Sequence, residues 1–216
     1  MLQFEDVAQN SEEWDLLRVG KITSSALSCA MANYGKAFGE PAKKYAVSIA
    51  LGQITGKVDP LGYSNEHMER GHEDEPLARM AYEEQTFSIV RNGGFFYDDD
   101  QGCSPDGLVG NNGAVEIKSR IPSIHYEHIR KQSFDPSNKW QLINNMKLPQ
   151  LEWIDYVSYC KSFPEDKKLF VVRLYAEQFK EEYKMIDTRI AEFRELIHVT
   201  KQTILNSNYF IEAKNE

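Results

Sequence analysis

The sequence contains few cysteines, and none of them has a metal-binding spacing. Cys29, Cys103 and Cys160 are scattered over 216 residues. Zinc ribbons and iron–sulfur clusters need closely spaced cysteines, and disulfide frameworks normally use an even number. The histidines show no HExxH motif, the spacing typical of a zinc peptidase. We therefore predict reduced thiols, and neither a zinc site nor an iron–sulfur cluster.

Long apolar runs are also missing. No segment approaches the roughly 20 apolar residues that a membrane-spanning helix requires. The first fourteen residues are acidic and include no apolar stretch of the kind found in signal peptides. We expect no membrane partner and a cytoplasmic location. Repeats, low-complexity tracts and long Pro/Gly/Ser linkers are absent too, which predicts a single domain over residues 1–216.

Positive charge is in short supply. Lys and Arg number 25 against 33 Asp and Glu, which gives a net charge of −8. Taken alone, this argues against a nucleic-acid-binding protein, because phosphate contacts need Lys and Arg. The acidic residues are concentrated in a few segments, however, and carboxylates that hold a metal ion reverse the local field. Whole-chain charge therefore does not exclude a nuclease.

Apolar periodicity, capping residues and turn signals predict an α/β protein. Gly71 and Pro76 predict a break or a new start within the fourth helix. The order of elements predicts a mixed β-sheet flanked by helices on both sides. The expected helices cover residues 11–19, 26–32, 41–55, 64–85, 123–132, 135–146 and about 176–205, and the expected strands cover 87–91, 95–97, 108–109, 114–118, 153–160 and 169–174.

One hairpin carries the residues suited to chemistry. Side chains alternate along a strand, so Glu116 and Lys118 share one face, while Val115 and Ile117 share the other. The Gly110-Asn111-Asn112-Gly113 segment is a strong hairpin signal, and it returns the chain so that Asp106 lies near Glu116. Two carboxylates and one ammonium group should then converge on one side of the sheet.

This set of groups suits phosphodiester hydrolysis. Mg²⁺ held by two carboxylates can activate a water and neutralise the charge that develops on the phosphate, and Mn²⁺ is the expected substitute. A cationic Lys118 would stabilise the phosphate or orient the nucleophile, and a deprotonated Lys118 would act as a base. On an exposed strand, Glu-x-Lys is normally a solvated ion pair. A buried strand, by contrast, rarely carries two charges without a partner or a metal.

Four sequence blocks follow one another between about residues 11 and 160. They are Trp14-x-x-x-Arg18 with Thr23-Ser24-Ser25; Arg70-Gly71 with Glu75; Ser104-Pro105-Asp106-Gly107 with Glu116-Ile117-Lys118; and Trp140-Gln141 through Asn145-Met146 with the segment from Trp153 to Tyr159. Together these blocks resemble the lambda-exonuclease and YqaJ-type phage recombination nucleases. That family belongs to the PD-(D/E)XK superfamily, so the resemblance implies a restriction-endonuclease-like core.

The resemblance also implies roles for individual residues. Asp106, Glu116 and the carbonyl oxygen of Ile117 would be metal ligands, and Lys118 would be the catalytic lysine. Glu75 would add a ligand to a second metal or an outer-sphere contact. Gln141 would complete the site, although the second glutamine that the family often has two residues later is replaced here by Ile143.

The N-terminal block resembles the family's pocket for a DNA 5′-phosphate. Arg18 can bind a phosphate bidentately, and Thr23, Ser24 and Ser25 lie at a predicted helix N-terminus. Ser104 would contribute to the same pocket. An alternative interpretation is that Thr23 and Ser24 only cap the helix.

The implied activity is a magnesium-dependent 5′-to-3′ exonuclease for double-stranded DNA. Members of the family release 5′-mononucleotides and leave 3′ single-stranded tails for a phage single-strand annealing protein, and they assemble as a homotrimeric ring in the bacterial host. A second hypothesis is a PD-(D/E)XK endonuclease. A third is a catalytically inactive module that binds DNA ends, against which the intact Asp106, Glu116 and Lys118 argue.

Overall fold

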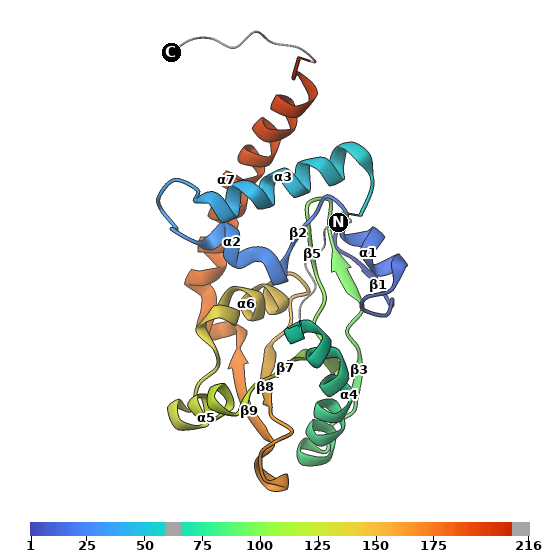
Figure 1. Cartoon of the computed structure of the whole chain (residues 1–216), viewed down its shortest axis with the longest axis vertical. Helices are drawn as coiled ribbons and strands as arrows, with labels where there is room; N and C mark the ends of the chain where they lie inside the picture. The colour runs from blue at the N-terminus through green and yellow to red at the C-terminus, as the bar shows by residue number, and fades with distance from the viewer. Residues whose placement is uncertain (59–65, 209–216) are drawn as a thin grey trace.

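The computed structural model of the chain describes residues 1–58 and 66–208, and of residues 66–72 it describes only the backbone. The described residues form nine strands and seven α-helices, and five of the strands, β3 to β7 (residues 90–119), follow one another without a helix between them. Figure 1 shows their arrangement in space. The strands are β1 Gln3–Glu5, β2 Ile22–Thr23, β3 Val90–Asn92, β4 Phe95–Tyr97, β5 Gln101–Cys103, β6 Gly107–Val109, β7 Gly113–Ser119, β8 Trp153–Tyr159 and β9 Leu169–Tyr175. The α-helices are α1 Glu12–Arg18, α2 Leu27–Met31, α3 Glu40–Thr55, α4 Glu66–Thr86, α5 Pro122–Lys131, α6 Lys139–Lys147 and α7 Lys180–Leu205, and the 3₁₀ turns are η1 Ser24–Ala26, η2 Pro136–Asn138, η3 Glu165–Lys167 and η4 Ala176–Phe179.

The strands form two mixed sheets. The larger sheet has the order β3-β6-β7-β8-β9, and only its β7–β8 pair is parallel. The helices α5 and α6 connect these two parallel strands, as a parallel crossover requires. The smaller sheet has the order β1-β4-β5-β2. The prediction of a mixed sheet flanked by helices is confirmed, but the expectation of one sheet was wrong.

The larger sheet lies between two helices. Val115 and Ile117 face α4, where they pack with Ala78 and Tyr82. Ala114 faces the other way and packs with residues of α6 such as Leu142. Alternation along β7 therefore places Glu116 and Lys118 on the α6 side of the sheet.

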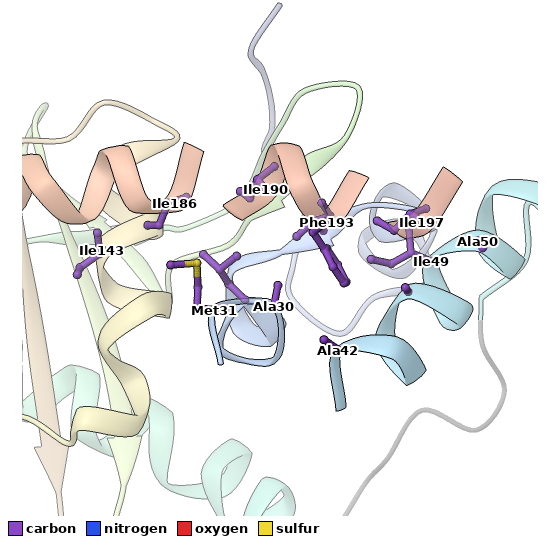
Figure 2. Packing of buried hydrophobic residues seen from close by; sticks show 13 residues of the cluster. Ala30, Met31, Ala42, Ile49, Ala50, Ile143, Ile186, Ile190, Phe193 and Ile197 are labelled. Carbon is purple, nitrogen blue, oxygen red and sulfur yellow. The ribbon is translucent and has the colours of Figure 1, made fainter. Parts of the chain in front are cut away.

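A second apolar core joins α7 to α2, α3 and α6. Ile190, Phe193 and Ile197 recur on one side of α7, as expected for an amphipathic helix that covers the rest of the fold. Figure 2 shows them directed toward residues of α2 and α3 that include Ala30 and Ile49. No helix in the described ranges combines the length and the apolar character that a membrane span requires.

The segment around Gly93 shows why the two strands expected at 87–91 and 95–97 lie in different sheets instead of forming a pair. The strand β3 joins the larger sheet, whereas β4 joins the smaller one, so the chain changes sheets between them. A Cβ atom at Gly93 would lie 1.7 Å from the carbonyl oxygen of Pro105, so only glycine allows the backbones to approach this closely. The short strands β1, β2 and β5 were not predicted: β1 and β2 pair with strands far away in sequence, and β5, although it follows its partner β4 closely, is only three residues long.

The predicted break in the fourth helix is wrong within the described chain. The helix α4 continues through Pro76. A proline inside a helix loses one backbone hydrogen bond, but Ala78 and Tyr82 are fully buried against the sheet and fix this part of the helix. The expected helix start at residue 64 and the side chains of the Arg70-Gly71 motif lie outside the described residues.

Candidate active site

The site lies where the pairing between β6 and β7 stops. The first residue of β6, Gly107, pairs with Val115, whereas β7 continues beyond Val115 along β8 to Ser119. We call the gap beside this unpaired part of β7 the notch. Asp106, the residue just before β6, fills the notch, because its Oδ2 accepts a hydrogen bond of 2.6 Å from the backbone N–H of Ile117. In a strand, the N–H and C=O of one residue point to the same side. The Ile117 carbonyl is therefore directed toward the edge where Asp106 lies.

Glu116 is fully buried and bound by side chains on both oxygens. Its Oε1 accepts hydrogen bonds of 2.6 Å from the Nζ of Lys118 and of 2.6 Å from the Nε2 of Gln141. Its Oε2 accepts a hydrogen bond of 2.9 Å from the Nδ2 of Asn145. The structure thus brings together Asp106, Glu116, Lys118 and Gln141, as the hairpin argument and the motifs predicted.

The charge of Lys118 is set by its neighbours. Burial alone would lower the pKa of Lys118, but Glu116 and Asp106 outweigh burial and raise this pKa above the ordinary value. Lys118 is therefore an ammonium group in this arrangement.

Glu75 reaches the site from α4. Burial and the negative charge of Asp106 raise the pKa of Glu75 to about 7, and the same two causes raise the pKa of Glu116 to about 7. Neighbouring Asp74 fixes this turn of α4 to the end of β7, since it accepts a hydrogen bond of 2.6 Å from Ser119 Oγ and lies 3.3 Å from Lys161 Nζ. Glu75, Asp106 and Glu116 therefore lie close enough together that the negative charge of one disfavours ionisation of the others.

These residues fit a divalent cation of the magnesium type. Among the described residues, no group of three His, Cys, Asp or Glu side chains could hold a metal by itself. Mg²⁺ needs no such group, because it keeps several waters and is commonly bound by one or two carboxylates. Asp106 and Glu116 supply hard oxygen donors. The pKa values of Glu75 and Glu116 are raised first by burial and then by the charge of Asp106, and a bound cation would favour the ionised carboxylates against both effects.

Gln9 holds the segment that bears Asp106. Its Nε2 donates to the carbonyl oxygens of Ser104 and Pro105, at 3.3 and 3.0 Å, and lies 3.5 Å from Asp106 Oδ1. Gln9 is only partly buried, and it is far from Asp106 in the sequence. No local sequence pattern points to this contact.

Gln9→Ala should reduce turnover on linear duplex DNA roughly tenfold, because partners that orient a metal-binding carboxylate contribute on this scale. The unfolding temperature should change little, since Gln9 is only partly buried. Gln3→Ala, at an exposed position of β1, provides the control. Equal turnover in the two variants would show that Gln9 does not orient Asp106.

Part of the predicted phosphate pocket is assembled in the structure. The guanidinium of Arg18 lies 3.7 Å from the centroid of the Trp14 ring. The hydroxyl of Thr23 lies 3.4 Å from that of Ser25 and 3.3 Å from that of Tyr45. Burial lowers the pKa of Arg18, while the nearby Tyr45 and Asp15 raise it. An arginine remains charged despite such a shift, so a cation and three hydroxyls lie in one region.

Two predicted members of this pocket are engaged elsewhere. Ser24 is buried, and its Oγ accepts a hydrogen bond of 2.9 Å from Asn144 Nδ2. Ser104 Oγ donates to the Gly94 carbonyl at 2.5 Å and accepts from Trp14 Nε1 at 3.1 Å. The alternative interpretation, in which Thr23 caps the helix, does not hold, because Thr23 makes no side-chain cap bond. The phosphate-binding roles stay predictions.

Tyr45 and Asn145 lie in these regions, although the sequence arguments assigned neither of them a role in the site. Tyr45 has only its place on an amphipathic helix to mark it, and that pattern equally indicates a core residue. Asn145 lies four residues after Gln141, which places the two on one face of a helix. This spacing is the signal that could have identified Asn145.

Comparisons with known proteins identify a family and a shared fold. The family model of the YqaJ-like viral recombinase domain matches residues 13–148. A crystal structure of an alkaline exonuclease (LHK-Exo) from Laribacter hongkongensis is 29% identical and gives a TM-score of 0.75, with coverage of 90% of this chain and 98% of that chain. The structure of LHK-Exo in complex with dAMP is 30% identical, with a TM-score of 0.76 and the same coverage.

A more distant structure shares the fold. It is a phage related exonuclease from Haemophilus somnus 129PT, with 12% identity, a TM-score of 0.66, and coverage of 88% of this chain and 98% of that chain. No curated protein sequence matches the chain.

Proposed function

The chain belongs to the family of YqaJ-like viral recombinase domains, and on this premise we propose that it is a magnesium-dependent exonuclease that digests double-stranded DNA from 5′ ends. The observation that carries the proposal is the convergence of Asp106, Glu116 and Lys118 in the notch between β6 and β7. A similar alkaline exonuclease was crystallised with dAMP, a 5′-mononucleotide of the kind that this reaction would release.

Each residue of the site has a distinct task in this proposal. Asp106, Glu116 and the Ile117 carbonyl would hold Mg²⁺, which when bound supplies a Lewis acid that polarises the phosphate and acidifies water. Lys118 keeps its proton and stabilises negative charge on the phosphate oxygens. Glu75 lies at the same edge and would contact the metal's hydration waters or a second ion. Gln141 orients Glu116.

The polarity follows from the phosphate pocket. Arg18, Thr23 and Ser25 would bind the terminal 5′-phosphate, with Tyr45 beside them. Ser24 and Ser104 would not contact the phosphate directly, because their hydroxyls already have protein partners, and would instead fix the backbone of the pocket. Loss of one nucleotide regenerates a 5′-phosphate, so the same pocket would bind the shortened strand.

The test is digestion of linear duplexes that carry one blocked end. With Mg²⁺ or Mn²⁺, the enzyme should release 5′-mononucleotides only when the 5′ end is open, and a chelator should stop the reaction. Internal cuts in a closed circular duplex would favour the endonuclease hypothesis. Binding to ends without any cleavage would favour the inactive end-binding module.

We also propose a homotrimeric ring that encloses the DNA and passes 3′ single-stranded tails to a phage single-strand annealing protein. An acidic chain gains from a ring, because a closed cyclic assembly keeps the duplex bound by topology rather than by surface charge. Light scattering should give three times the chain mass of 24.9 kDa, and digestion should remain processive when excess competitor DNA is added. A monomer at micromolar concentration with distributive digestion would contradict the ring.

A further inference from the structure

The helix α6 presents two amides to the same carboxylate. Gln141 and Asn145 are four residues apart and therefore lie on one face of the helix. Gln141 donates to Glu116 Oε1 at 2.6 Å, and Asn145 donates to Glu116 Oε2 at 2.9 Å. Since Lys118 also binds Oε1, Asn145 makes the one side-chain contact to Oε2 that is found in the described part of the chain.

The residue two positions after Gln141 cannot supply this contact. Ile143 is fully buried in the apolar core between α6 and α7. Figure 2 shows its side chain beside that of Ile186 from α7, in a cluster that also contains Met31. The second amide of the site therefore comes from one helical turn beyond Gln141 rather than from position 143.

Burying the side chain of Asn145 at this position costs free energy of folding. The side chain is completely buried, and its Oδ1 has no hydrogen-bond partner among the described residues. Buried polar groups almost always have partners, so each exception points to a role or to a further ligand. Because Oδ1 belongs to the same planar amide as the Nδ2 that binds Glu116, this unpaired acceptor is held close to the Glu116 carboxylate.

We propose that Asn145 is a positioning residue that fixes Glu116 in the orientation that binds metal. This inference rests on the proposed function. Lys118 and Gln141 hold one oxygen of Glu116, and Asn145 holds the other, so the carboxylate cannot rotate about its terminal bond without breaking a buried hydrogen bond. Residues that orient a metal ligand in this way affect metal affinity and turnover together.

The experiment compares Asn145→Ala and Asn145→Leu with the wild-type enzyme. Leucine has nearly the shape of asparagine, so it keeps the packing and removes only the polar atoms. Calorimetric titration with Mn²⁺ should show binding weakened 10- to 100-fold in both variants. The kcat at a fixed low Mn²⁺ concentration should fall, KM for DNA should stay the same, and excess Mn²⁺ should restore part of kcat.

Asn144→Leu is the matched control. Asn144 is also buried and also has an unpaired Oδ1, but it binds Ser24 rather than Glu116. Its Mn²⁺ affinity should stay within threefold of wild type. The inference is overturned if the Asn145 variants bind Mn²⁺ as wild type does, or if Asn144→Leu weakens binding as much as they do. A wild-type protein that binds no Mn²⁺ and cuts no DNA would instead overturn the proposed function itself.

Discussion

Asp106→Asn, Glu116→Gln and Lys118→Ala should each lower turnover on linear duplex DNA by at least ~10²-fold, the scale on which loss of one electrostatic stabiliser acts. The first two changes remove negative charge that would hold the metal, and the third removes the ammonium group that would stabilise the phosphate. Single-turnover rates with saturating enzyme separate this loss from a change in DNA affinity, which should stay near the wild-type value.

A control is needed because Glu116 and Lys118 form a buried ion pair, and breaking such a pair also lowers stability. Arg173→Ala provides it, since Arg173 binds the buried carboxylate of Asp155 on β8, with contacts of 2.8 Å to both oxygens. This variant should lose stability in thermal unfolding and yet retain turnover at temperatures where it is folded. Near-normal turnover of any one of the three site variants would remove that residue from the mechanism.

The local part of the site could be predicted from the sequence. Glycines at both ends of a four-residue turn specify the β6–β7 hairpin, and alternation along β7 then puts Glu116 and Lys118 on one face. These steps use neighbours within about a dozen residues. The resemblance to known nucleases added Gln141 and Glu75, which no local pattern connects to the hairpin.

The remaining parts depend on contacts between distant segments. Gln9 reaches Asp106 across 97 positions, and Asn144 reaches Ser24 across 120. The division into two sheets also depends on pairings between distant segments. It could not be predicted, because strands of two or three residues have too little periodicity to show in a sequence. Tertiary packing also overrode the local rule at Pro76, where the buried side of α4 keeps the helix continuous.

The partners of Ser24 and Ser104 illustrate a further limit. A hydroxyl-rich segment before a helix looks uniform in the sequence, but the Thr23 hydroxyl lies near those of Ser25 and Tyr45, whereas the Ser24 hydroxyl accepts a hydrogen bond from Asn144. Thr23 and Ser24 are both buried. Which partner each of these adjacent polar side chains contacts depends on the fold around η1, and composition does not encode it.

Arg18→Ala should slow digestion of a 5′-phosphorylated duplex by roughly 10- to 100-fold in kcat/KM, the range expected when charge-assisted hydrogen bonds to a phosphate are lost. The same change should have much less effect on a 5′-hydroxyl duplex, which wild-type enzyme should digest slowly. A terminal phosphate carries more charge than a bridging phosphodiester, so a guanidinium held against Trp14 and near Tyr45 can distinguish an end from the interior of a strand.

The test depends on the ratio of the digestion rate on the 5′-phosphate duplex to that on the 5′-hydroxyl duplex, because unfolding or a general loss of DNA affinity would lower both rates alike. Lys21→Ala is the matched control: it removes a cation three residues away, whose Nζ donates to the backbone carbonyl oxygens of Asp98 and Asp99 rather than facing the Thr23 hydroxyl. Its ratio of 5′-phosphate to 5′-hydroxyl digestion should equal that of wild type, whereas Arg18→Ala should bring the ratio close to one. If wild-type enzyme digests both ends equally fast, the pocket does not recognise a terminal phosphate, and Arg18 only stacks on Trp14 within α1.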